Sequence, residues 1–297
     1  MNEKESKEHH WWPVGLQSYW ADENGDVSWI TPDGSINKKR YRNRKIGQKI
    51  RGHTLLRSGR WKTNFEDEFS IDSKVHDIVE ALLSLSPDGF QPLEMEKGFI
   101  EDQLSRDLQL FVMSLLIRSP SSRHRYELYP TMVGLPPNED VGKANMNQSY
   151  RLARKICETG IISNRHYTLL SSAEPHFIYG DGCLDWISAS LLAQRISGRA
   201  LIALTPHLCL YINTPTVMRI NRNYASIRAT PSMVARANRI SQIYSKEKLF
   251  FLGDVPKLDR DFRRGEFLQH AVFTDGLFDE LDTMTGHCDK PGFLTGF

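Results

Sequence analysis

The chain has 297 residues, of which 40% are hydrophobic and 10% aromatic. This composition is sufficient for a sizeable folded core. No apolar stretch approaches the roughly 20 residues of a transmembrane helix, and the charged residues 1–8 precede no apolar segment typical of a secretory signal. The four cysteines form no CxxC pair, so their spacing indicates neither a zinc site nor a disulfide framework. We therefore expect a cytoplasmic protein that does not contact a membrane.

The net charge of +2 conceals a strongly uneven distribution of charge along the chain. Residues 38–62 hold eleven Lys or Arg and no acid, so the other 272 residues carry a net charge of −9. A second acid-free run, residues 186–246, holds eight basic residues, whereas residues 274–289 hold five acids and no base. Such segregation indicates either a polyanionic partner or docking of one part of the chain on another.

The N-terminal part of the chain is predicted to be a β meander over residues 9–52. Strands are expected at 14–20 and 27–31, separated by the hairpin dipeptide Asn24-Gly25. A further strand is expected after the second hairpin dipeptide, Asp33-Gly34.

Residues 66–160 are predicted to be mainly helical. Ser70 is placed to cap a first helix, and residues 105–118 are apolar on nearly every face, which is typical of a helix buried in a core. Ser119-Pro120 is expected to end that helix, and a loop with Gly134, Pro136 and Pro137 is expected to lead to a third helix at 143–158.

Residues 161–255 are predicted to be rich in strands. Strands are expected at 166–170, 176–179, 200–204, 207–212 and 249–252, with helices at 187–197 and, after the Thr230-Pro231 start signal, at 233–244. The pattern predicts an α+β fold, with a mixed, mainly antiparallel sheet and several packed helices, one of them fully buried. We expect one domain over residues 9–255, preceded by a disordered N-terminus (1–8) and followed by an acidic C-terminal tail (256–297).

Several short motifs, taken in their order along the chain, resemble a bacterial family catalogued as a domain of unknown function, number 4238. The resemblance lies in His10-Trp11-Trp12-Pro13, Asp72 on an early helix, Arg118-Ser119-Pro120, the strand-end Asp181, Leu204-Thr205-Pro206 and Asn238. The chain departs from the family pattern in having Asp rather than Glu at 72, and in lacking the Ser and Pro that flank the strand-end aspartate. The resemblance implies an α+β fold and a bacterial source, but no particular reaction.

Four residues of these motifs are candidates for catalysis. His10 could act as a general base, because histidine titrates near neutrality, and it could equally be a hydrogen-bonded anchor of the first strand. Arg118 ends an apolar helix and requires an acidic or phosphate partner, for which Asp72 and Asp181 are the candidates. Together, His10, Asp72, Arg118 and Asp181 would suit phosphodiester chemistry, with the carboxylates binding a metal such as Mg²⁺.

The start of the first basic run is the best candidate for a nucleic-acid-binding surface. Its residues combine phosphate-binding charge with an aromatic ring on which a base could stack. The alternatives are a solvated hairpin or a surface on which the acidic tail docks. The residues concerned are Lys38, Lys39, Arg40, Tyr41, Arg42, Arg44 and Lys45.

Two functions of different classes follow from these candidates. The first is a nuclease or related phosphodiesterase acting on nucleic acid, with RNA favoured, as a toxin or phage-defence effector that has an antitoxin or defence partner. The second is a non-catalytic module that binds nucleic acid or protein, in which the His, Asp and Arg residues are structural.

Overall fold

A computed structural model of the chain describes residues 8–41, 46–57, 61–65, 68–85, 91–159, 165–174, 176–185, 199–213, 222–267 and 275–286. The α-helices are α1 (Val14–Gln17), α2 (Val75–Ser84), α3 (Asp102–Arg118), α4 (Pro120–Leu128), α5 (Glu139–Thr159), α7 (Pro231–Ile243) and α8 (Gly276–Thr285). The predicted helix at 187–197 lies outside the described residues.

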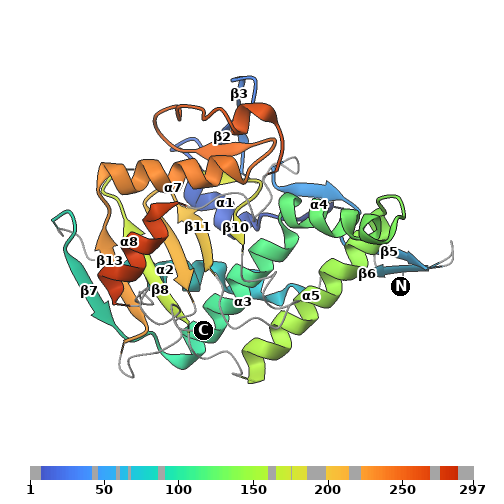
Figure 1. Ribbon diagram of the computed structural model, residues 1–297, viewed down its shortest axis with the longest axis horizontal. Coiled ribbons are helices and arrows are strands. Elements are labelled where there is room, and N and C mark those ends of the chain that lie inside the picture. The colour runs from blue at the N-terminus through green and yellow to red at the C-terminus, as the bar shows by residue number, and fades with distance from the viewer. Residues whose placement is uncertain are drawn as a thin grey trace, which may run out of the picture.

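Within these ranges, the strands form two larger sheets and two small ribbons (Figure 1). The six-stranded sheet has the order β10 (Leu184–Asp185), β11 (Arg199–Thr205), β12 (Leu208–Asn213), β8 (His166–Ser171), β13 (Tyr224–Arg228) and β7 (Met95–Gly98). The four-stranded sheet has the order β3 (Ile36–Arg40), β2 (Asp26–Ile30), β14 (Leu249–Phe251) and β9 (Tyr179–Gly180). The ribbons pair β1 (Glu8–His10) with β4 (Gln48–Ile50), and β5 (Thr54–Arg57) with β6 (Trp61–Asn64).

Most strand pairs are antiparallel, and the parallel neighbours are β8 and β13. Every residue of β8 and β12 is buried, which is typical of strands that are covered on both faces. On one side of these strands lie α7 and α8 (Figure 1). The predicted α+β class, with a mixed, mainly antiparallel sheet, is therefore confirmed.

Helix α3 is the buried helix that the sequence predicts. All residues from Phe111 to Arg118 are buried, because the helix contacts α5 on one side and α2 and α4 on others. It belongs to a continuous hydrophobic core that extends from Trp11 near the N-terminus to Leu281 in α8. No helix within the described ranges is long and apolar enough to span a bilayer.

Residues 14–20 form helix α1 and a 3₁₀ turn, so the prediction of a strand there is wrong. The buried side chains are Leu16, Gln17 and Trp20, whose spacing of three and four residues is helical. Trp20 anchors the turn, since its indole Nε1 donates a hydrogen bond to the carbonyl oxygen of Leu204 at 3.0 Å. The expected meander is thereby reduced to the β2–β3 hairpin, whose turn contains Gly34 with φ of 88°.

Within the stretch expected to be an acidic tail, the described residues 275–286 are part of the fold. Residues 276–285 form α8, and its side chains Leu277, Phe278 and Leu281 lie in the hydrophobic core. At the other end of the chain, residues 1–7 lie outside the described ranges, and Glu8 begins β1.

Candidate functional site

Arg118, at the C-terminal end of α3, is fully buried and pairs with Asp72. Its Nη1 donates to Asp72 Oδ2 at 2.8 Å and its Nη2 donates to Asp72 Oδ1 at 2.6 Å, a bidentate geometry. The guanidinium also lies 4.4 Å from the centre of the Phe69 ring. The expectation that Arg118 requires an acidic partner is confirmed, and the partner is Asp72, which lies on a 3₁₀ turn (Ser70–Lys74) rather than on a helix capped by Ser70.

His10 reaches this ion pair with its backbone rather than its ring. Its carbonyl oxygen accepts a hydrogen bond from Arg118 Nη1 at 3.2 Å, whereas its ring Nε2 lies 2.5 Å from Nε2 of Gln48 on the paired strand β4. The neighbouring His9 is the histidine that points into the core. Successive side chains of a strand face opposite sides, so the burial of one places the other outward.

His9 and His53 form a buried pair that the sequence analysis did not identify. Their rings stack at 5.2 Å, and His9 Nδ1 accepts a hydrogen bond from the backbone N–H of His53 at 2.6 Å. The ring of His53 lies 4.9 Å from that of Phe69, which in turn contacts Arg118. The two histidines therefore pack behind Phe69, the ring that contacts the Arg118 guanidinium. The signal that could have revealed them is the strand alternation at 8–10.

Asp181 makes its side-chain contacts at the turn between α7 and β14. Its carboxylate accepts hydrogen bonds from the backbone N–H groups of Lys246 at 2.8 Å and Glu247 at 3.0 Å. Burial raises the pKa of Asp181 to about 6, although these backbone hydrogen bonds lower it. Asp72 and Arg118 thus meet beside the His10 backbone. The Asp181 carboxylate bonds a different turn, while its backbone carbonyl oxygen accepts a hydrogen bond from Ser121 N–H at 3.4 Å, three residues after Arg118.

The raised pKa of Asp181 predicts a specific pH dependence of stability. The folded state holds the proton more tightly than the unfolded chain, whose pKa is 3.8, so the contribution is complete below pH 4 and is lost as the pH rises through 6. From pH 4 to pH 7, the free energy of unfolding should therefore fall by about 2 kcal/mol relative to that of Asp181→Asn. Urea denaturation of both proteins measures this difference, and a difference that is constant with pH would contradict the assignment.

Within the described ranges, no set of side chains fits the predicted binding of Mg²⁺. These ranges contain no group of three or more His, Cys, Asp or Glu side chains that could hold a metal ion. Asp72 directs both carboxylate oxygens at Arg118, and Asp181 directs both of its own at backbone N–H groups. No chemical step is therefore assigned to a metal.

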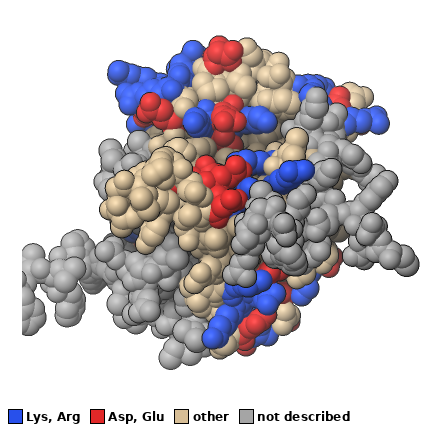
Figure 2. Space-filling model, turned by 90° about the vertical axis from the view of Figure 1, so that its right-hand side faces the viewer, with Lys and Arg blue, Asp and Glu red and all other residues tan. Residues whose placement is uncertain are grey.

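The β2–β3 hairpin presents the start of the first basic run on an edge strand. Lys38 is neutralised by Asp22 at 2.5 Å, whereas neither Lys39 nor Arg40 forms an ion pair with any described residue. Arg40 is exposed and Lys39 is half-exposed. Basic and acidic side chains lie together at the top of the view in Figure 2, the end at which β2 and β3 lie in Figure 1.

The remaining residues of the candidate basic surface differ in their accessibility. Tyr41 is half-buried and packs against the core beside Gly25, so its ring is not presented as a free stacking platform. Further along the run, Lys49 lies 3.5 Å from the carboxylates of both Glu127 and Glu139. Arg42, Arg44 and Lys45 lie outside the described residues.

The second basic run is the one on which the acidic segment docks. Arg199 donates to Asp282 at 2.6 Å and to Asp279 at 3.4 Å, and Arg236 bonds Asp275 and Glu280. Ion pairs within the chain therefore account for part of the uneven distribution of charge along the sequence. The alternative in which the acidic segment covers the β2–β3 hairpin is wrong for these four acids.

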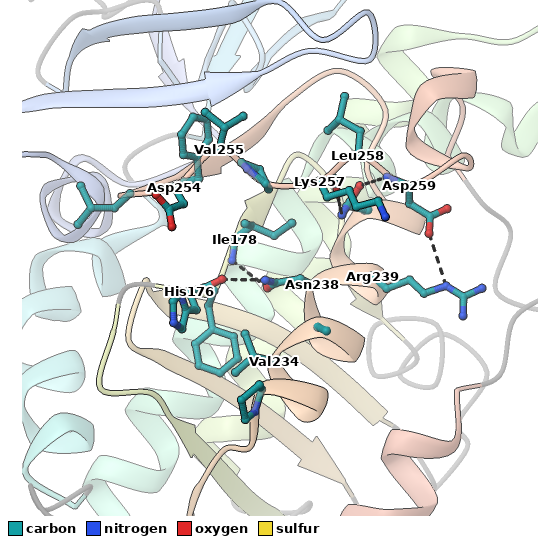
Figure 3. A pocket seen from close by; sticks show the side chains of 17 residues that line it. His176, Ile178, Val234, Asn238, Arg239, Asp254, Val255, Lys257, Leu258 and Asp259 are labelled. Atoms are coloured by element: carbon teal, nitrogen blue, oxygen red, sulfur yellow. Dashed lines mark hydrogen bonds and ion pairs between the residues drawn. The ribbon is translucent and has the colours of Figure 1, made fainter.

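A cavity of about 590 Å³ lies beside α7, and none of the four candidate catalytic residues lines it (Figure 3). Asn238 spans one wall: its Nδ2 donates to the His176 carbonyl oxygen at 2.7 Å, and its Oδ1 accepts from Ile178 N–H at 3.1 Å. Gln242, one turn later, holds the backbone of Lys257 and Asp259 in the same way. Both amides thus fix the cavity walls, which assigns Asn238 a structural role.

Comparison with protein-family models, curated proteins and solved structures found no match for this chain. The resemblance to the domain family of unknown function therefore stays a prediction.

Proposed function

We propose that the protein is a non-catalytic nucleic-acid-binding module that contacts phosphates through the β2–β3 hairpin. The observation that carries this proposal is that Lys39 and Arg40, whose side chains lie on opposite faces of the edge strand β3, have no acidic partner in the described ranges. They are the second and third members of the run of eleven basic residues, 38–62, that contains no acid. Because no acid of the described fold neutralises them, both side chains can bind phosphates. Binding would release the cations that are condensed on a nucleic acid.

The geometry around Arg118 favours this interpretation over a nuclease. A cation that stabilises a phosphorane must direct hydrogen bonds at the substrate, whereas both terminal nitrogens of the fully buried Arg118 already bond Asp72, whose side chain is 28% exposed. Buried bidentate pairs of this kind are commonly architectural. The nuclease interpretation, and with it a role as toxin or phage-defence effector, stays a prediction.

Labelled single-stranded RNA, single-stranded DNA and duplex DNA test the proposal directly. Each is incubated with the protein in Mg²⁺ or in EDTA, and both mobility and length of the nucleic acid are followed. We expect a salt-sensitive shift without cleavage under both conditions. Absence of any shift at low salt would contradict binding. Cleavage that a correctly folded His10→Ala variant has lost would instead establish the nuclease, because a general base contributes about 10² to 10⁴ in rate and little to affinity.

A further inference from the structure

The connection between α4 and α5 exposes an unusual concentration of apolar side chains. We name residues 129–141 the apolar tip. Met132 is 78% exposed, Val133 76%, Tyr129 60% and Leu135 58%. From Tyr129 to Asn138 the segment contains no charged residue. An exposed apolar patch of this kind marks an interaction surface more often than a scattered single side chain does.

Backbone hydrogen bonds hold the apolar tip in one conformation. Leu135 N–H donates to the Pro130 carbonyl oxygen at 3.1 Å, and Asn138 N–H donates to the Glu127 carbonyl oxygen at 2.9 Å. Gly134 provides the left-handed backbone conformation, with φ of 77°, that closes the turn. Because the tip is already ordered, it loses little conformational entropy when a partner covers it.

Charges of both signs surround the base of the apolar tip. Lys49 lies 3.5 Å from Glu127 and from Glu139, and Lys143 lies 3.3 Å from Glu139 and 3.9 Å from Asp140. Figure 2 looks onto this end of the molecule, where uncharged surface borders acidic and basic side chains. Because these acids and bases pair with one another within the chain, the rim carries no large excess of either sign that would repel a second copy of the same surface.

We propose that the apolar tip is a self-association surface through which two copies of the chain pair about a two-fold axis. The exposed side chains of one tip offer on the order of 500 Å² of apolar surface, so two tips would bury about 1,000 Å², at the lower end for a specific interface. A weak, concentration-dependent dimer is the expected result. The proposal is independent of nucleic-acid binding, because it uses a different surface. An anionic bilayer fits less well, since Glu139 and Asp140 are exposed beside the tip.

Sedimentation velocity over a range of protein concentrations tests the pairing. The native chain should shift from its monomer mass of 34.1 kDa towards twice that value as concentration rises. The variant Met132→Glu/Val133→Glu should remain monomeric, because it places four like charges in the contact. A matched control, Phe99→Glu/Val255→Glu, changes side chains that are 57% and 52% exposed elsewhere, and it should dimerise like the native chain. Thermal melting should show all three proteins equally folded.

Three outcomes would overturn the proposal. One is a native chain that stays monomeric at the highest concentration. Another is dimerisation that survives Met132→Glu/Val133→Glu, which would place the contact elsewhere. The third is a monomeric native chain that binds phosphatidylcholine or phosphatidylserine vesicles and loses this binding in the tip variant, which would make the tip a lipid contact.

Discussion

Replacing Asp72 by alanine is expected to lower the free energy of unfolding by about 3–5 kcal/mol, because it leaves the buried Arg118 guanidinium without its carboxylate. The pair is bidentate and Arg118 is fully buried. Urea denaturation followed by circular dichroism measures the change. The matched control is Glu68→Ala, which breaks a surface pair with Arg151, a side chain that is 59% exposed. That control should cost below about 1 kcal/mol.

A second variant separates an uncompensated charge from lost packing at the same position. Asp72→Ala combined with Arg118→Met removes the charge and keeps most of the side-chain volume. It should therefore be more stable than Asp72→Ala alone. If Asp72→Ala costs no more than Glu68→Ala, the ion pair does not stabilise the fold as described.

Replacing Asp282 by alanine should weaken the docking of helix α8 on the sheet and cost about 2–4 kcal/mol. The carboxylate of Asp282 accepts hydrogen bonds from Tyr211 at 2.9 Å, Asn213 at 2.7 Å and Arg199 at 2.6 Å. Its side chain is only 7% exposed, so water replaces these bonds poorly. In the variant, Tyr211 and Asn213 would lose this acceptor, and Arg199 would keep only the exposed Asp279 at 3.4 Å.

Asp279→Ala provides the matched control for Asp282→Ala. Both acids lie on α8 and contact the same Arg199, but the side chain of Asp279 is 75% exposed and its contact is 3.4 Å long. Asp279→Ala should change the free energy of unfolding by less than about 1 kcal/mol. Equal effects of the two substitutions in urea denaturation would argue against the buried network.

The sequence predicts the elements whose hydrophobic pattern is unambiguous. Helix α3 is apolar on all sides, α7 begins at Thr230-Pro231, and the β2–β3 hairpin turns at Asp33-Gly34. The partner requirement of Arg118 was also predictable, because a charge at the end of a buried helix needs an opposite charge.

Other features of the fold depend on signals that are ambiguous in the sequence or on contacts between distant residues. The pattern does not predict helix α4, because Ser119-Pro120 is equally typical of a helix end and of a helix start. Pro120 is the first residue of α4, and Ser119 caps this helix by accepting a hydrogen bond from Ser122 N–H. Which acid pairs with Arg118 depends on tertiary packing, since Asp72 lies 46 positions away. The docking of α8 on Arg199 and Arg236 is equally non-local. The distribution of charge along the sequence therefore indicates that each basic run needs an acidic partner, but it does not identify that partner.

The salt dependence of nucleic-acid binding tests the central claim most directly. Lys39→Ala/Arg40→Ala should reduce the slope of log K against log salt concentration by about 0.7 to 0.9 for each lost phosphate contact. Arg151→Ala/Arg154→Ala removes the same charge from paired positions on α5 and should leave the slope unchanged. An equal slope in the hairpin variant and the native chain, with the affinity retained, would contradict the assignment of the binding surface to the β2–β3 hairpin.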